Sequence, residues 1–365
     1  NLSLSISTLS LSIFLEADPN LHYRGALSHD AILTTRVGMS NKGSIVIGVD
    51  GGATKTLAVA LLLTEDGSKR ETVGQGASGS SNRNSVGEAA AEGALTDAVG
   101  KALAQAGKGL DDVRCIVLGM SGCDREVDVQ YWKEACSRLA PKAKSVVEND
   151  AVIALCSGTN GALHGIVVIS GTGSIGMAIN KDERVRAGGW GPLLGDAGNG
   201  YAIGLAALAA VTRAEDGRST TPAPLLKSLV LKHLNRTSVA DLLGWAYGKG
   251  GKGTGDWDRI AALAPCVFEA ARGGCSTSEA VLVRAGEHIA ELAETVARRS
   301  GLGAEGGEGI KVVLAGGINA DADSALARTV EERLKMGLPS AQLVRPDASV
   351  SPAVAAAFLG CTYLQ

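Results

Sequence analysis

The chain has 365 residues and a formal net charge of −3 at pH 7, so its electrostatics do not favour a nucleic acid or an anionic membrane as partner. Hydrophobic residues make up 45% of the chain and aromatic residues only 3%, so Ala, Val, Leu and Ile must build most of the core. The seven dispersed cysteines contain no C-x-x-C pair, which excludes the usual zinc and redox motifs. Such thiols suit a reducing compartment, so we expect a cytoplasmic protein.

Residues 1–42 differ from the rest of the chain. Leu2–Leu15 alternates Leu and Ile with Ser and Thr, and no basic segment precedes it, so a secretory signal is not expected. An organelle transit peptide remains an alternative. We predict that residues 1–42 form a disordered leader.

From residue 43 onward, short apolar runs alternate with helical segments, and the pattern restarts near residue 146. The first part reads strand, strand, strand, helix, strand, helix. Its clearest elements are strands at 45–49, 57–63 and 114–120 and helices at 88–105 and 127–139. The second part predicts strands at 145–147, 165–169, 175–179, 311–314 and 342–344. It predicts helices at 151–157, 201–213, 221–234, 239–247, 260–272, 279–299, 322–334 and 353–359.

The first strand pair surrounds a glycine turn that is suited to an anion. Glycines allow backbone N–H groups to approach a phosphate closely, and the hydroxyl and ammonium groups that follow add donors. The candidate phosphate ligands are Gly51, Gly52, Thr54, Lys55 and Thr56. Asp50, at the end of the buried strand, is suited to a hydrated Mg²⁺. The segment matches neither a P-loop nor G-x-G-x-x-G, and an ordinary hairpin is the alternative.

A second glycine turn, 170–174, joins the strands 165–169 and 175–179 in the same way. Gly171, Thr172 and Gly173 are its candidate phosphate ligands, and a plain hairpin is again the alternative. Two copies of one phosphate-binding hairpin indicate two related domains that face each other across a nucleotide.

Asp150 is the candidate catalytic base, because it ends a predicted strand and begins a helix close in sequence to the second turn. An N-cap aspartate would look the same in sequence. Asp196 is a candidate for binding sugar hydroxyls or for capping a helix. Asn82 can bind a sugar or make a turn, and Trp190 can stack on a sugar or pack. Asp124 is a secondary candidate, and Lys249 and Lys252 are expected to be solvated.

Five segments together resemble the N-acetylglucosamine kinases of the actin-like sugar-kinase superfamily, in the branch of the BadF/BadG-type ATPases. They are GVDGGATKT, END at 148–150, ISGTGS at 169–174, GGWGPLLGDAG at 188–198 and VLAGGI at 313–318. The resemblance covers about residues 44–360. It implies that Asp150 is the base and that Thr54 and Thr172 bind phosphate. It implies sugar contacts from Asn82, Ser174, Gly189, Trp190 and Asp196, and an adenosine turn at Gly316 and Gly317.

The resemblance also implies an α/β fold with two ribonuclease-H-like domains. Mixed five-stranded sheets are expected because strand hairpins lead into a βαβ pattern. We expect the domains to be 43–146, completed by the helix 353–360, and 147–352. The implied reaction is ATP-dependent phosphorylation of N-acetylglucosamine with Mg²⁺, and the implied partner is a small amino sugar. We also expect a homodimer.

Three alternatives remain at this point. Glucosamine, N-acetylmannosamine or glucose would offer similar hydroxyl groups to the site. A BadF-type relative would instead be an ATPase that activates a radical dehydratase and holds an iron–sulfur cluster, for which Cys123 and Cys156 lie in suggestive regions. A sugar sensor would bind the sugar without phosphorylating it.

Overall fold

The computed structural model describes residues 43–52, 54–120, 123, 125–181, 183–247, 257–303 and 309–365. The predicted leader 1–42, Asp124 and the loop that contains Lys249 and Lys252 lie outside the described residues. Among the helices that are described, none is both long and apolar enough to cross a membrane.

The first half of the chain folds into a mixed sheet with the strand order β3-β2-β1-β4-β5. The first three strands are antiparallel, and β4 and β5 run parallel to β1. The strands are β1 (Gly43–Gly51), β2 (Thr56–Thr64), β3 (Arg70–Ser78), β4 (Val113–Met120) and β5 (Lys144–Glu148). The helices are α1 (Arg83–Val86), α2 (Glu88–Ala106) and α3 (Glu126–Leu139), with a 3₁₀ turn at Leu110–Asp112.

The second half repeats this topology. Its sheet has the order β10-β9-β6-β7-β8, which is the order and direction of the first sheet when it is read from β8. The strands are β6 (Gly165–Ser170), β7 (Ser174–Asn180), β8 (Glu183–Gly188), β9 (Lys311–Ala315) and β10 (Gln342–Val344). The prediction of two mixed five-stranded sheets is thereby confirmed for the described residues.

Most of the helices lie in the second half. They are α5 (Gly200–Glu215), α6 (Pro224–His233), α7 (Asp241–Tyr247), α8 (Trp257–Ala261), α9 (Ala264–Arg272), α10 (Ser276–Ser300) and α11 (Ala325–Gly337), with a 3₁₀ turn at Gly317–Asn319. The predicted helix 260–272 is wrong, because the chain breaks there into α8 and α9. Pro265 lies in the first turn of α9 and has no N–H to continue a helix from α8. α11 begins at Ala325 rather than at 322, because Ser324 caps it by accepting a hydrogen bond from the Ala327 amide at 3.1 Å.

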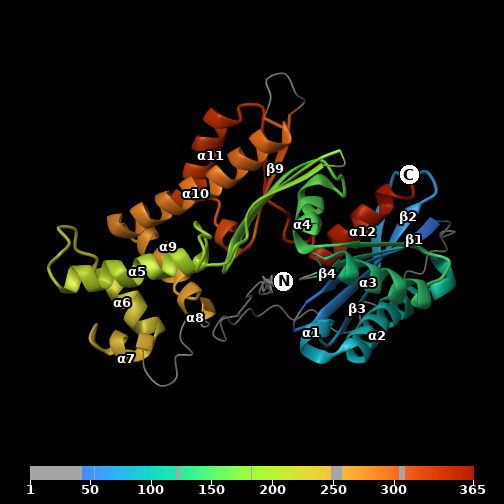
Figure 1. The fold of residues 1–365 in the computed structure, drawn as a ribbon, viewed down its shortest axis with the longest axis horizontal. Helices are drawn as coiled ribbons and strands as arrows, with labels where there is room; N and C mark the ends of the chain where they lie inside the picture. Colours follow the sequence, from blue (N-terminus) through green and yellow to red (C-terminus); the bar gives the residue numbers. More distant parts are fainter. Residues whose placement is uncertain are drawn as a thin grey trace, which may run out of the picture.

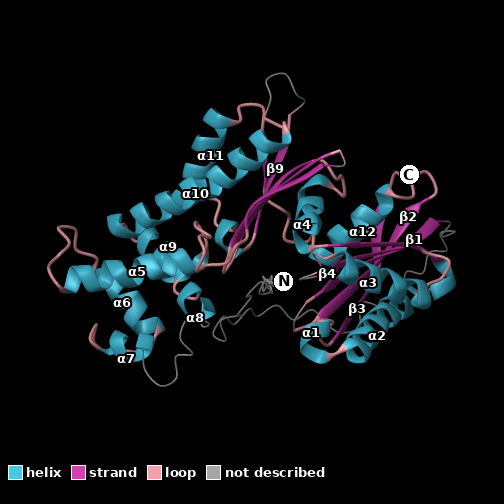
Figure 2. Cartoon of the chain, in the orientation of Figure 1, coloured by secondary structure: helices cyan, strands magenta, loops and turns pink. Residues whose placement is uncertain are grey.

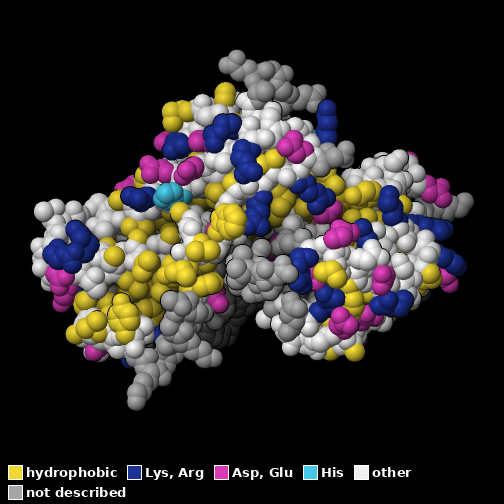
Figure 3. Space-filling view, in the orientation of Figure 1, with side chains coloured by type: hydrophobic (Ala, Val, Ile, Leu, Met, Phe, Trp, Pro, Cys, Tyr) yellow, Lys and Arg dark blue, Asp and Glu magenta, His cyan; other side chains and the backbone are white. Residues whose placement is uncertain are grey.

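Each sheet buries both of its faces. α2 and α3 pack on the face of the first sheet that carries Ile45 and Ile47, whereas the helices of the second half cover Ile166 and Val168 of β6. Figure 2 shows these helices on the outer sides of the two sheets. On the face of the molecule seen in Figure 3, Lys and Arg side chains are interspersed with Asp and Glu rather than gathered into one basic surface.

Two further helices, α4 (Asp150–Thr159) and α12 (Pro352–Thr362), lie between the sheets (Figure 1). They share one buried cluster with Val46 of β1 and with Val167 and Val313 of the second sheet. α12 lies directly on β1, where a Cβ at Gly48 would be 2.0 Å from the Ala353 carbonyl oxygen. Glycine is therefore required at this position for the close approach of helix and strand.

Candidate active site

The turn between β1 and β2 presents Thr54 and Lys55 to solvent. Its backbone is closed by a hydrogen bond from the Gly52 amide to the Lys55 carbonyl oxygen at 3.0 Å. Thr56 differs from its neighbours, because its side chain is buried and its hydroxyl donates to the Gly79 carbonyl oxygen at 2.8 Å. A Cβ at Gly51 would be 2.4 Å from the Met120 sulfur. The turn therefore offers backbone N–H groups, Thr54 and Lys55 to a ligand, whereas the Thr56 hydroxyl anchors it.

Asp50 lies beside this turn at the carboxyl end of β1. Burial raises the pKa of its carboxyl above the usual value, and Lys55 partly offsets the effect. A cation at this carboxylate would compensate for the lost hydration, so the residue fits a divalent ion that keeps most of its water ligands. Among the described residues, no three or more His, Cys, Asp or Glu side chains lie close enough together to hold a metal ion by themselves.

Asp150 lies at the same edge of the first sheet as Asp50. In the register of the parallel strands, Asp50 pairs with Gly119, and Gly119 pairs with Glu148 at the end of β5. Asp150 begins α4 directly after this edge. The helix is capped by Asn149, whose side-chain oxygen accepts a hydrogen bond from the Val152 amide at 3.0 Å. Capping therefore does not account for an aspartate at position 150.

The second turn lies between β6 and β7 and has a fixed backbone. The Gly171 amide donates to the Gly173 carbonyl oxygen at 2.9 Å, and the Ser170 hydroxyl donates to the Gly198 carbonyl oxygen at 2.8 Å. The Thr172 hydroxyl donates to a carboxylate oxygen of Asp258 on α8 at 3.0 Å. A Cβ at Gly171 would meet no atom within 4 Å, so the turn faces open space.

The predicted adenosine turn lies against this second glycine turn. Gly316 follows β9 with a φ of 89°, and a Cβ there would be 2.2 Å from the Ser170 carbonyl oxygen. Gly317 begins a 3₁₀ turn, and a Cβ there would meet nothing within 4 Å. Three predicted ligand segments of the second half, at 171–173, 188–198 and 316–317, are thus neighbours.

Asp196 organises the loop that follows β8. It is only 5% exposed, and its two carboxylate oxygens accept hydrogen bonds from the Trp190 amide at 2.9 Å and the Ser174 amide at 3.2 Å. The Gly189 amide donates to the Ser174 carbonyl oxygen at 2.8 Å. The cap of α5 is Asn199, which accepts from the Ala202 amide at 2.7 Å. Asp196 therefore holds two other predicted sugar residues together, Ser174 and Trp190, and the Gly189 amide is bonded to Ser174.

The Trp190 ring stands out from this loop and is 66% exposed. The guanidinium group of Arg186 lies over it, 5.4 Å from the ring centre. Asn82, the fifth predicted sugar residue, lies on the first half at the start of α1, where its carbonyl oxygen accepts from the Ser85 amide at 2.9 Å.

Sequence reasoning missed β8 and its two arginines. Arg184 donates two hydrogen bonds of 2.7 Å to the two carboxylate oxygens of Glu148, and so joins the two sheets. The signal that was available is the alternation of Arg184, Val185 and Arg186, which is typical of a strand with one buried face. The cysteines give little support to a cluster site, since burial raises the pKa of the Cys156 thiol to about 12 and Cys123 is buried.

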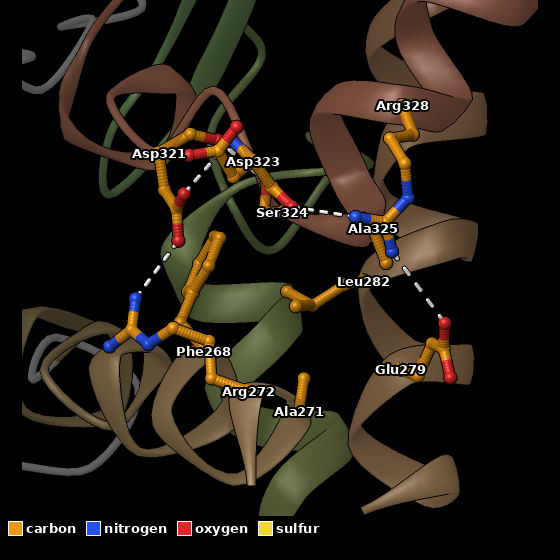
Figure 4. A pocket seen from close by; sticks show the side chains of 10 residues that line it. All are labelled: Phe268, Ala271, Arg272, Glu279, Leu282, Asp321, Asp323, Ser324, Ala325 and Arg328. Carbon is orange, nitrogen blue, oxygen red and sulfur yellow. Dashed lines mark hydrogen bonds and ion pairs between the residues drawn. The ribbon is translucent and has the colours of Figure 1, made fainter. Parts of the chain in front are cut away.

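A cavity of about 210 Å³ lies between α9, α10 and the start of α11 (Figure 4). Four of its charged side chains form two ion pairs. Arg272 and Asp321 are 2.9 Å apart, and Arg328 and Glu279 are 3.7 Å apart. None of the predicted site residues lines this cavity.

The sequence matches the model of the BadF/BadG/BcrA/BcrD ATPase family over residues 47–360. It is 35% identical to the N-acetyl-D-glucosamine kinase of Dictyostelium discoideum over 324 residues, which cover 86% of this chain and 97% of that protein. It is 32% identical over 207 residues to the N-acetylmuramic acid/N-acetylglucosamine kinase of Clostridium acetobutylicum, which covers 56% of this chain and 65% of that protein. A solved structure from Chromobacterium violaceum, named as a candidate N-acetylglucosamine kinase, has a TM-score of 0.58 and 27% identity and covers 87% of this chain and 99% of its own.

Proposed function

Because the chain belongs to the BadF/BadG/BcrA/BcrD ATPase family, we propose that it is a sugar kinase that phosphorylates the 6-hydroxyl of N-acetyl-D-glucosamine with ATP. The products are N-acetylglucosamine 6-phosphate and ADP. The observation that carries the proposal is the 35% identity to a kinase of this name, nearly all of which is covered by the alignment.

Asp150 is the proposed general base. Phosphoryl transfer depends mainly on the position of the reactants and on neutralisation of charge, so the chain needs one proton acceptor near the attacking hydroxyl. The capping of α4 by Asn149 supports this role, because it leaves the cap geometry independent of Asp150. Asp150 would take the proton of the 6-hydroxyl as the oxygen bonds to the γ-phosphorus and the bond to the β-phosphate oxygen breaks.

The two glycine turns are the proposed holders of the ATP phosphates. The first contributes the backbone of Gly51 and Gly52 with the side chains of Thr54 and Lys55, and the second contributes the residues 171–173. Gly316 and Gly317 would lie at the adenosine. When Mg²⁺ is bound, it neutralises charge on the β- and γ-phosphates, and Asp50 is the residue proposed to hold it through water. The open space at Gly171 and Gly317 supports a ligand there.

The sugar is proposed to bind at the loop that Asp196 organises, together with Asn82 from the first half. A carboxylate has about four lone-pair positions, so Asp196 can accept from sugar hydroxyls in addition to two backbone amides. The exposed ring of Trp190 offers an apolar surface to the face of the sugar or to its acetyl methyl group.

A coupled assay of ADP release with MgATP and four sugars tests the proposal. The rate of ADP release with N-acetylglucosamine should exceed the rates with glucose, glucosamine and N-acetylmannosamine. If the site binds the amide N–H and C=O of the acetyl group, the protein groups that bind them are left unpaired when glucose is bound. The cost is about 1–3 kcal/mol of binding free energy per group. Equal kcat/KM for glucose would refute the choice of substrate but not the kinase activity. If no sugar raises ADP release above the water background, the kinase proposal fails.

We further propose a cytoplasmic homodimer. Exposed apolar side chains gather over α6 and α7 on the face seen in Figure 3, and Leu243 and Tyr247 are among the most exposed large apolar residues that the structure describes. Light scattering coupled to size exclusion measures the mass directly. A mass of about 37 kDa, that of one chain, would refute the dimer.

A further inference from the structure

The strand β8 carries two arginines on one face, and they extend toward different parts of the candidate site. Side chains alternate across a strand, so Arg184 and Arg186 share a face and Val185 lies buried on the other. Arg186 donates to the carbonyl oxygens of Gly188 and Gly189, both at 3.2 Å, and lies over Trp190. It therefore supports the proposed sugar loop.

Arg184 connects the same strand to the segment that precedes Asp150. Its two terminal nitrogens donate to the two oxygens of Glu148 at 2.7 Å, and the Glu148 side chain is buried. Such a paired arrangement fixes the direction as well as the distance between the two side chains. Glu148 is the last residue of β5 and lies two residues before Asp150, with only the helix cap Asn149 between them.

From these contacts we propose that Arg184 is a positioning residue of the kinase reaction: through Glu148 it sets Asp150 relative to the sugar loop, which Arg186 of the same strand supports. The inference rests on the proposed function. The base and the sugar loop come from different sheets, so their separation is not fixed by either sheet alone. A base must lie within hydrogen-bond reach of its proton, and an error of about 1 Å costs roughly 10²-fold in rate.

The test uses the full chain with the double substitution R184M/E148Q, which removes both charges. R184M alone leaves buried Glu148 unpaired and risks unfolding, whereas the double variant leaves neither charge behind. R184K keeps the positive charge but cannot form the two parallel hydrogen bonds to Glu148. The matched control is R333M, which breaks the 2.9 Å ion pair of Arg333 with Glu294, far from Asp150 in the sequence and between α10 and α11.

We expect the double variant to lose about 10- to 100-fold in kcat, and R184K to lose less. The KM for N-acetylglucosamine and its calorimetric Kd should stay within about threefold of the wild type, because the sugar loop keeps Arg186 and Asp196. R333M should retain the wild-type kcat, and its melting temperature serves as the reference for loss of an ion pair.

Each outcome decides between the roles. If the double variant has a lower melting temperature but the wild-type kcat, it has lost only a structural ion pair. That result overturns the inference. A rise in sugar Kd that matches the fall in kcat/KM, with kcat unchanged, also overturns it, because Arg184 would then act on binding. A wild-type chain without sugar-dependent ADP release overturns the proposed function, and this inference with it.

Discussion

Asn149 caps α4 by accepting a hydrogen bond from the amide of Val152 at 3.0 Å. The carboxylate that follows at position 150 lies in the first turn of the helix, where a negative charge is stabilised by the helix dipole by about 0.3–1 kcal/mol. The helix cap and the proposed base are therefore two different adjacent residues, and each can be tested without the other.

Asp150→Asn should reduce kcat by about 10²–10⁴-fold, since the amide cannot accept the proton. Unfolding in urea should show a loss of stability below about 1 kcal/mol. Asn149→Ala is the matched control and should cost about 1 kcal/mol of stability through the lost cap. Near-normal turnover in Asp150→Asn would contradict the assignment of the base.

Asp196→Asn should weaken sugar binding about tenfold or more. The amide group replaces one acceptor by a donor that faces a backbone N–H, either of Ser174 or of Trp190, and each lost charge-assisted bond is worth about 1.5–3 kcal/mol. Calorimetric titration with N-acetylglucosamine measures the effect. Retention of the wild-type Kd would show that the loop does not need the carboxylate to bind the sugar.

Gly316→Ala and Gly317→Ala form a second pair of tests. At Gly316 the φ of 89° and the 2.2 Å approach to Ser170 both oppose a side chain, so stability should fall by at least about 1–3 kcal/mol. At Gly317 a methyl group meets nothing, so stability should change by less than about 0.5 kcal/mol. If the adenosine lies there, Gly317→Ala should raise the KM for ATP.

Asp50→Asn should make the ligand-free protein more stable at neutral pH. Burial raises the pKa of Asp50, so the folded state holds this proton to a higher pH than the unfolded state. Its ionisation therefore lowers stability as pH rises from the unfolded to the folded pKa, and the loss persists above that range. The variant has no such loss. The melting temperature of the wild type minus that of Asp50→Asn should thus fall as pH rises from 4 to 8.

The same pair of proteins tests the proposed metal site. Mg²⁺ with ATP should raise the melting temperature of the wild type more than that of Asp50→Asn. Equal shifts in both proteins would show that Asp50 does not contribute to holding the ion.

Much of the fold was predictable because its strands are apolar runs that end in glycine turns, as at 45–52 and 165–171. β8 was missed because it is a short edge strand in which only Val185 is buried, so the alternation of Arg184, Val185 and Arg186 is the only sign of it in the sequence. The division between α8 and α9 was visible only as a single proline, which also occurs inside first turns.

The site was predictable as a set of segments, but not as a set of contacts. The two turns can be recognised in the sequence from the spacing of their glycines. Three of the contacts join residues that are more than 15 positions apart in the sequence. They are the hydrogen bond of Thr56 to Gly79, the hydrogen bond of the Ser174 amide to Asp196, and the pair of Arg184 with Glu148. Periodicity along the chain carries no information on such pairs.

The packing of α12 on β1 has a consequence for the order of events during synthesis. The face of β1 that carries Val46 and Gly48 is covered by residues 352–362, about 300 positions later in the chain. On the ribosome, the first sheet therefore emerges with this face bare, and it remains so while the whole second half is translated. The nascent chain must keep that apolar surface from aggregating until its final helix arrives, so removal of residues 352–362 should impair the first sheet rather than the second.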